Sequence, residues 1–267
     1  MDRIPFPFSN SEDSPAASAR LKEASLFRHR LHVYKRPRVA ILSTGDELVD
    51  IAAEPAANQI RNSNSYSLAA QVHAAGGVPV VLPIAPDELE RLRHLVRQGL
   101  TSDLLLLSGG VSVGKYDLVE QVLAELGAEF FFTGAHIQPG RPVVFGRAPA
   151  RPGALPTHFF GLPGNPVSTM VCFELFARLM VEALAGASPR RMTFTQARLR
   201  YDVKVKTGLT RFLPALLSGE YERSEVELVK WQGSGDMAAT ARANCYLVVP
   251  PDREMLAAGD MVSLLLV

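Results

Sequence analysis

Two glycine-containing turns in this 267-residue chain carry the residue types that bind phosphate through the backbone. The first is Ser108-Gly109-Gly110-Val111-Ser112-Val113-Gly114, which lies between a leucine-rich segment and a helical pattern. Glycines allow backbone N–H groups to converge on an anion, and the N-terminus of a following helix adds its dipole. A tight strand-to-helix turn is the alternative explanation. Tyr116 stands where a P-loop has the Ser or Thr that ligates magnesium, which argues against an ordinary nucleoside triphosphatase.

The second turn is Gly161-Leu162-Pro163-Gly164-Asn165-Pro166-Val167-Ser168, again before a helical pattern. Pro166 suits the first helical position, and the Ser168 hydroxyl lies near N–H groups that have no helical partner. Capping of the helix by Asn165 explains this turn equally well when the turn is taken alone. The two turns together predict a polyanionic ligand.

Acidic residues follow the predicted strands at matching places. Asp46 and Glu47 follow the first strand, Asp87 follows the second, and Asp117 lies just beyond the first glycine turn. We expect all four at one edge of a parallel sheet. Carboxylates that face bound phosphates repel them unless a cation intervenes, so the pattern predicts a bridging Mg²⁺ ion. Helix capping is the alternative for Asp87 and Asp117.

Two further loops could contact such a ligand. Ile137-Gln138-Pro139-Gly140-Arg141-Pro142 is expected to be a rigid, exposed loop in which Arg141 holds an oxyanion or is simply a surface arginine. Ser234 lies in a glycine-rich turn, where it contacts ligand or belongs to an ordinary β-turn.

The segments between these motifs alternate between strand and helix patterns. This order predicts an α/β fold in three layers, with a mainly parallel sheet, helices on both faces and ligand at the carboxyl ends of the strands. The expected strands are Val39 to Thr44, Val78 to Ile84, Asp103 to Ser108, Ala128 to Thr133, Val143 to Gly146 and His158 to Gly161; the expected helices are Tyr66 to Ala75, Asp87 to Gln98, Asp117 to Leu126 and Pro166 to Ala185.

The pattern changes after Pro189 to short alternating stretches, which predict a small all-β domain. These stretches are Gln196 to Val205, Arg211 to Ser218, Glu225 to Trp231, Cys245 to Val249 and Met261 to Val267. We therefore expect a disordered lead over residues 1–25, a connector over 26–37, the α/β domain over 38–187 and the β domain over 188–267. The connector is basic, and is either an arm that touches phosphate or a solvated link.

Composition excludes several classes of protein. With 28 Lys and Arg against 27 Asp and Glu, the net charge of +1 gives no overall attraction to nucleic acid or to a membrane. The most apolar stretch, Pro166 to Leu184, carries Glu174, Arg178 and Glu182 at i,i+4 spacing, so we expect a soluble amphipathic helix with a solvated charged stripe. Cys172 and Cys245 fit neither a disulfide framework nor a zinc site, so reduced, buried thiols in a cytoplasmic protein are expected.

Four of these motifs, in this order, resemble those of the molybdopterin molybdenumtransferases, the molybdenum insertases related to the C-terminal domain of gephyrin. They are Ser43-Thr44-Gly45-Asp46-Glu47-Leu48, the first glycine turn with Asp117, Pro139-Gly140-Arg141-Pro142, and the second turn. The resemblance covers Arg38 to Val267. It implies a molybdopterin-binding α/β domain followed by a β-barrel-like C-terminal domain.

The resemblance also implies an activity. Family members are Mg²⁺-dependent cytoplasmic transferases that insert molybdate into adenylated molybdopterin and release AMP, and they act as homodimers. Molybdopterin adenylyltransferase and molybdoenzymes are the implied partners. The implied catalytic residues are Glu47, Asp87, Asp117 and Arg141, of which the first three hold the metal ion; the implied substrate-binding residues are Thr44, Gly45, Asp46, Ser108, Gly109, Gly110, Ser112, Gly114, Pro139, Gly140, Gly164, Asn165, Ser168 and Ser234.

The chain departs from the family pattern in two ways. Gly134, Gln138 and Arg141 stand where many members have lysines in or before the Pro-Gly loop, while Arg211 matches a family arginine less securely. Family members also carry two further domains ahead of the position of Arg38, one of which completes the site of the dimer partner, so half a pocket is expected here. Two alternatives follow: a molybdopterin adenylyltransferase, which the all-β domain argues against, and a non-catalytic molybdopterin-binding or scaffold protein.

Overall fold

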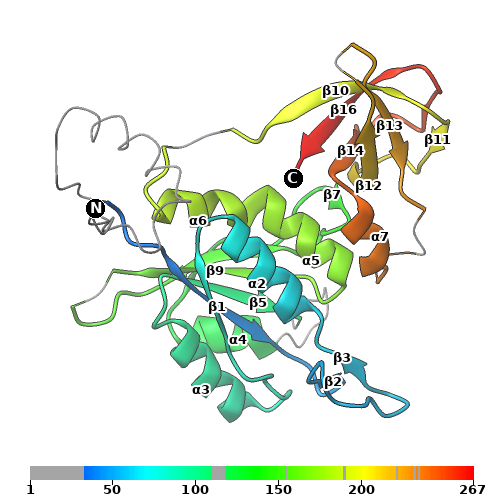
Figure 1. The fold of residues 1–267 in the computed structure, drawn as a ribbon. Coiled ribbons are helices and arrows are strands. Elements are labelled where there is room, and N and C mark those ends of the chain that lie inside the picture. Colours follow the sequence, from blue (N-terminus) through cyan, green and yellow to red (C-terminus); the bar gives the residue numbers. More distant parts are fainter. Residues whose placement is uncertain are drawn as a thin grey trace, which may run out of the picture.

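The computed structural model describes residues 33–109, 118–153, 155–188, 191–220, 222–230, 233 and 235–267. Their larger part is an α/β layer structure built on a six-stranded sheet of order β4-β1-β5-β9-β8-β6 (Figure 1). The first four strands are parallel, while β8 is antiparallel to β9 and β6 is antiparallel to β8. The strands are β4 (Val78–Val81), β1 (Arg38–Ser43), β5 (Leu104–Ser108), β9 (Thr157–Leu162), β8 (Val144–Ala148) and β6 (Glu129–Phe132).

The leucines of β5 show why this sheet lies between two helical layers. Side chains of a strand point alternately to opposite faces, and here Leu105 and Leu107 join one apolar core while Leu104 and Leu106 join the other. The first core includes α3 (Leu89–Gly99) and α4 (Leu118–Glu125). The second includes α2 (Asn64–Ala74), α5 (Pro166–Cys172) and α6 (Arg178–Leu184). The predicted three-layer α/β fold is therefore confirmed.

The helix expected over Pro166 to Ala185 contains a π-helical turn, η1 (Phe173–Ala177), between α5 and α6. The prediction that its charged stripe is solvated was wrong, because Glu174 and Glu182 are buried. Glu174 accepts hydrogen bonds from Arg178 and, at 2.7 Å, from Gln71 of α2. Pairing makes burial of these charges tolerable, since an unpaired charge in a core is strongly unfavourable.

A short arm leaves the sheet edge after β1. It consists of β2 (Leu48–Val49) and β3 (Ile60–Arg61), a parallel pair that the strand pattern did not predict. The amide of Ile60 donates to the Glu47 carbonyl at 2.8 Å, so the arm begins at the residues expected to do chemistry. It lies on the side of the molecule toward which the parallel strands run (Figure 1).

The C-terminal strands form a closed ring, because β13 pairs both with β10 and with β12. The ring consists of β10 (Phe194–Leu199), β16 (Met261–Leu266), β14 (Cys245–Val249), β12 (Thr210–Ser218) and β13 (Glu225–Leu228). This β-rich C-terminal part confirms the second half of the predicted fold. The stretch expected to run from Gln196 to Val205 is instead two elements, since β10 ends at Leu199 and β11 (Val203–Lys204) pairs with β15 (Met255–Leu256).

The ring and the α/β part share a strand and a core. β7 (Ile137–Gln138) pairs in parallel with β12, although β7 comes from the chain segment between strands of the first sheet. A shared core joins Val167, Val171 and Leu175 of the long helix to Phe212, Tyr246 and Leu265 of the ring. The helix α7 (Met237–Arg242) also contacts α5. The barrel is thus packed directly on the helix that follows the second glycine turn.

Two other expectations concern the cysteines and the membrane. Cys172 and Cys245 are free and buried, as predicted. Burial raises the pKa of the Cys172 thiol to about 12 and that of the Cys245 thiol to about 11, so both are protonated at neutral pH. None of the helices within the described ranges is long and apolar enough to cross a bilayer.

Because a shared core joins the barrel to the α/β part, removing a buried side chain from this core should lower the free energy of unfolding measurably. Phe212→Ala removes a buried ring from β12, so we expect the free energy of unfolding to fall by about 3–5 kcal/mol. Leu216→Ala, on the same strand but 37% exposed, is the control and should cost less than about 1 kcal/mol. Urea denaturation of both variants makes the comparison. Equal losses would contradict the assignment of Phe212 to a core between the two parts.

Candidate functional site

The ends of three parallel strands meet at one edge of the sheet. The Thr44 amide donates to the Ser108 carbonyl at 3.0 Å, and the Gly109 amide donates to the Leu162 carbonyl at 3.3 Å. A Cβ atom placed on Gly164 would lie 3.7 Å from the Cα of Gly109. The described start of the first glycine turn therefore adjoins the second glycine turn.

Gly109 is required by the way these ends pack. Its φ is +88°, in the left-handed region, and an added Cβ would lie 2.6 Å from the Thr44 carbonyl oxygen. Both facts exclude a larger side chain, since φ above zero is costly for other residues and a backbone carbonyl cannot move aside cheaply. The glycine therefore lets the end of β5 approach the end of β1.

A buried amide that the sequence motifs did not indicate links this edge together. Asn64, the first residue of α2, donates from Nδ2 to the Ser108 hydroxyl at 2.7 Å and to the Gly164 carbonyl at 2.7 Å. Nearby, Asn62 donates to the Ser65 hydroxyl, which lies 3.0 Å from the Ser43 hydroxyl. The available signal was the polar run that these residues form directly before a helical pattern.

Three of the four predicted carboxylates gather at the same edge. The Asp87 amide donates to Asp46 Oδ1 at 3.0 Å, and the Glu47 carboxylate folds back over Gly45, where an added Cβ would lie 2.5 Å from Glu47 Oε2. Partial burial, followed by the charges of Asp46 and Glu47, raises the pKa of the Asp87 carboxyl. The described ranges contain no group of three or more His, Cys, Asp or Glu side chains arranged to hold a metal ion.

Several predicted site residues lie outside the described residues. They are Gly110, Ser112, Gly114, Asp117 and Ser234. Their assignments, and with them the third proposed metal ligand, stay predictions.

The Pro-Gly loop packs against the helix that follows the second turn. Gln138 and Arg141 are exposed, as expected, but the prediction of an exposed loop was wrong for Pro139 and Gly140, which are buried. The cause is close packing on α5: the Cys172 thiol donates to the Gly140 carbonyl at 3.5 Å, and a Cβ on Gly140, whose φ is +108°, would collide with that sulfur. The Gln138–Pro139 peptide bond is cis.

The same loop is held from the barrel side. Arg211 of β12 donates from its guanidinium to the Gln138 side chain and, at 2.9 and 2.7 Å, to the Lys206 carbonyl. Arg211 therefore lies beside the Pro-Gly loop, while its match to a family arginine stays a prediction. The barrel therefore fixes the strand from which Arg141 is presented.

The second turn is arranged to leave polar groups exposed. Gly164 and Asn165 are exposed, whereas Ser168 is buried at the start of α5. Asn165 occupies the N-cap position with Pro166 after it, but its side chain makes no capping hydrogen bond. The side-chain capping that offered an alternative explanation for Asn165 is therefore not formed.

The basic connector ends at the opposite edge of the sheet. Lys35 pairs with Asp103 at 3.0 Å, and Asp103 directly precedes β5. The Asp103 carboxylate also accepts from the Arg38 amide at 2.8 Å. For this described portion, the contacts favour a connecting role over contact with phosphate.

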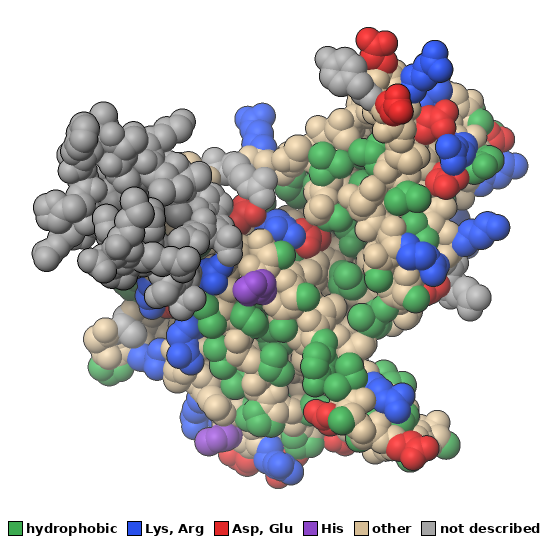
Figure 2. All heavy atoms as spheres, viewed as in Figure 1, with side chains coloured by type: hydrophobic (Ala, Val, Ile, Leu, Met, Phe, Trp, Pro, Cys, Tyr) green, Lys and Arg blue, Asp and Glu red, His purple; other side chains and the backbone are tan. Residues whose placement is uncertain are grey.

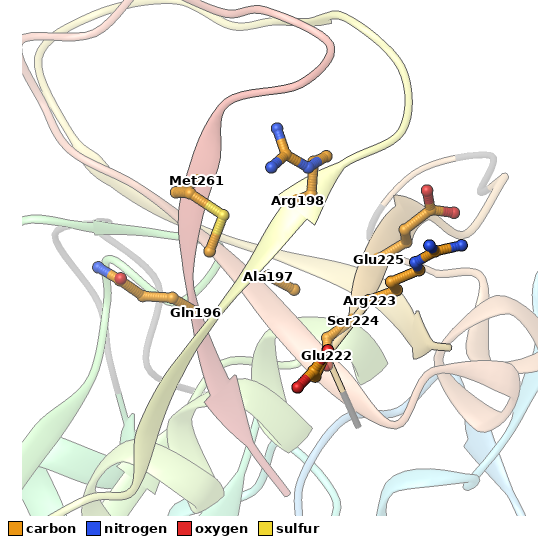
Figure 3. A pocket seen from close by; sticks show the side chains of 8 residues that line it. All are labelled: Gln196, Ala197, Arg198, Glu222, Arg223, Ser224, Glu225 and Met261. Atoms are coloured by element: carbon orange, nitrogen blue, oxygen red, sulfur yellow. The ribbon is translucent and has the colours of Figure 1, made fainter. Parts of the chain in front are cut away.

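The surface around the candidate edge is hollowed between the barrel and the β2–β3 arm, on the side where the parallel strands end (Figure 2). A separate cavity of about 490 Å³ lies in the barrel itself, where β10 and β13 diverge beyond their short pairing (Figure 3). Charged side chains, including Arg198, Arg223 and Glu225, line this cavity. None of the predicted site residues lines it, so the sheet edge stays the candidate site.

Two family models match the chain. "Probable molybdopterin binding domain" matches residues 40–183, and "MoeA C-terminal region (domain IV)" matches residues 196–267. A molybdopterin molybdenumtransferase of Nostoc is 34% identical over 242 residues, covering 88% of this chain and 54% of the relative. That of Haemophilus influenzae is 30% identical over 244 residues, covering 90% of this chain and 59% of the relative. The chain thus spans little more than half the length of these relatives.

Solved structures show the same likeness. A molybdopterin biosynthesis MoeA protein of Pyrococcus horikoshii superposes with a TM-score of 0.70 at 29% sequence identity. The match covers 86% of this chain and 54% of that protein.

Because β5 approaches β1 closely at Gly109, a methyl group added there should lower the free energy of unfolding more than one added at an uncrowded glycine. Gly109→Ala adds both left-handed strain and a clash with the Thr44 carbonyl, so we expect a loss of about 2–5 kcal/mol in the free energy of unfolding. Gly76→Ala is the matched control, because Gly76 has a φ of +87° and nothing within 4 Å of the added Cβ. It should lose only about 1–2 kcal/mol, from strain alone. Chemical denaturation compares the two, and equal losses would contradict close packing of Gly109 on the Thr44 carbonyl.

Proposed function

Because the chain belongs to the molybdopterin molybdenumtransferase family, we propose that it acts in molybdenum cofactor biosynthesis, inserting molybdate into adenylated molybdopterin with release of AMP. The observation that supports this most directly is the contact between Gly109 and Gly164. It brings the two turns predicted to bind phosphate to one edge of the sheet. Adenylated molybdopterin carries a pyrophosphate, and two adjoining turns with backbone donors suit such a ligand.

The site would work mainly by positioning. Backbone N–H groups of the two turns would hold the phosphates, which need local donors because the chain has a net charge of only +1. Thr44, Gly45 and Asp46 line the end of β1 and would contact the same ligand. The exposed Arg141 would place molybdate, since a guanidinium offers a fixed fork of donors to an oxyanion. Gly134 and Gln138 supply no positive charge, so Arg141 bears this role in the Pro-Gly loop.

The carboxylates fit a magnesium ion in their chemistry. Asp46, Glu47 and Asp87 are hard oxygen donors, and partial burial, followed by the charges of Asp46 and Glu47, raises the pKa of Asp87. Glu47 and Asp87, with Asp117 as the third ligand, would hold the ion. It would neutralise charge on the pyrophosphate.

A homodimer is part of the proposal, because the family resemblance implies that a second subunit completes the pocket. Molybdopterin adenylyltransferase would deliver the adenylated substrate and molybdoenzymes would receive the product. We place the reaction in the cytoplasm.

The adenylyltransferase alternative is weaker, because residues 196–267 match the MoeA C-terminal region. A scaffold protein would bind molybdopterin without turnover. Two assays on the full chain separate these functions. With adenylated molybdopterin, molybdate and Mg²⁺ the proposed enzyme releases AMP, whereas with molybdopterin and ATP an adenylyltransferase consumes ATP; a scaffold does neither. Folded Asp117→Ala should lose AMP release, while Asp103→Asn, at the opposite edge, should retain it. A folded wild-type protein that releases no AMP would overturn the proposal.

The carboxylate cluster predicts a trade between stability and function at Asp87. Because its pKa is raised in the folded protein, the ionised form opposes folding, and stability falls as pH rises through this pKa. Asp87→Asn should therefore be more heat-stable than wild type at pH 7, and the difference should vanish below the ordinary pKa of aspartate. Melting temperatures measured from pH 3 to 8 test this. The same variant should release AMP more slowly, and a gain in both properties would contradict the assigned role.

A further inference from the structure

Asn64, the first residue of α2, connects the ends of two strands. Its side chain bonds to Ser108 at the end of β5 and to Gly164, which follows β9. Asn64 is only 9% exposed, and its Nδ2 lies 2.7 Å from both Ser108 Oγ and the Gly164 carbonyl oxygen. A carbonyl oxygen accepts but never donates, so the Gly164 contact requires the NH₂ group of Asn64 on that side. The orientation of the amide is thereby determined.

This orientation leaves the other end of the amide without a partner. Asn64 Oδ1 is buried and has no hydrogen bond among the described residues, and neither has the buried hydroxyl of Thr44 beside Ser108. A buried acceptor without a partner destabilises the fold. A side chain selected for stability alone would not keep this cost, so the role of Asn64 lies in what its donor holds.

Its donor holds one peptide group of the second turn. The peptide unit between Gly164 and Asn165 is planar and trans, so its N–H points away from its C=O. Because Asn64 draws the Gly164 carbonyl inward, the Asn165 N–H points outward. Gly164 and Asn165 are both exposed, and the Asn165 amide makes no hydrogen bond to any described residue.

We infer that Asn64 is a positioning residue, which holds the Gly164 carbonyl inward so that the Asn165 N–H faces a phosphate oxygen of the substrate. This inference rests on the proposed function. Without the hydrogen bond from Asn64, the peptide between Gly164 and Asn165 is free to rotate, since a glycine precedes it and allows both orientations. The anion would then lose an aligned donor.

Asn62 provides a matched control. It is also a buried asparagine beside the start of α2, but its side chain bonds to the amide and hydroxyl of Ser65, within its own segment. Removing it should weaken the start of the helix without touching Gly164. The two asparagines thus separate a local structural role from positioning of the turn.

The test is the dissociation constant of AMP, measured by isothermal titration calorimetry on the full chain at a temperature where each variant is folded. Asn64→Ala and Asn64→Ser should weaken AMP binding about tenfold or more, since an aligned hydrogen bond to a charged group is lost. Asn62→Ala should change it less than about twofold while lowering the melting temperature. Unchanged binding by the Asn64 variants, or an equal loss in Asn62→Ala, would overturn the inference.

Asn64→Asp adds a readout that a purely structural role would not move. An ionised carboxylate cannot donate to the Gly164 carbonyl, but a protonated one can donate a single hydrogen bond. The ratio of its dissociation constant to that of wild type should therefore fall as pH is lowered from 8 to 4.5, whereas the ratio for Asn64→Ala should stay constant. A wild-type protein that does not bind AMP would overturn the proposed function itself. Binding by wild type together with a flat ratio for Asn64→Asp would overturn only the inference.

Discussion

The parallel pairing of β1, β5 and β9 is the constraint on which the site depends. Ser43 lies beside Ser108, and Ser108 beside Leu162, so the next residue of each strand enters the same edge of the sheet. The motifs follow these strands directly. The register of three apolar strands, which owe their stability to two cores of buried leucines and phenylalanines, therefore fixes the distance between polar turns that are far apart in the sequence.

The parts of the fold that follow from local pattern were predicted from the sequence. The leucine run of β5 and the glycines beyond it are readable because a strand buried on both faces has an unbroken apolar sequence, and because few residues other than glycine accept the backbone of Gly109. What failed depends on packing partners. Glu174 is buried because Arg178 and Gln71 are placed to pair with it, and no spacing rule contains the position of Gln71 on another helix.

The candidate site shows the same division. Turns and carboxylates were found because their residue types are chemically distinctive. Asn64 was missed because its significance lies in its contacts with Ser108 and Gly164, which are far from it in the sequence. The Pro-Gly loop was half predicted. Exposure of Arg141 follows from its charge, but burial of Gly140 follows from the Cys172 thiol that covers it. The pairing of β7 with the barrel likewise required knowing where β12 lies.

The charges of the candidate site are a second constraint on it. On the proposed function, a chain with almost no net charge binds a polyanion beside acidic side chains whose like charges, after partial burial, raise the pKa of Asp87. The repulsion is confined to an exposed edge, while the leucines beneath it remain buried, so the fold tolerates it. Arg211 contacts Gln138 of the Pro-Gly loop, and Gly140 of that loop packs on Cys172 of α5, the helix that follows the second turn. The acidic residues and Arg141 thus come from separate loops of the α/β part, and the barrel is in contact with the loop that carries Arg141.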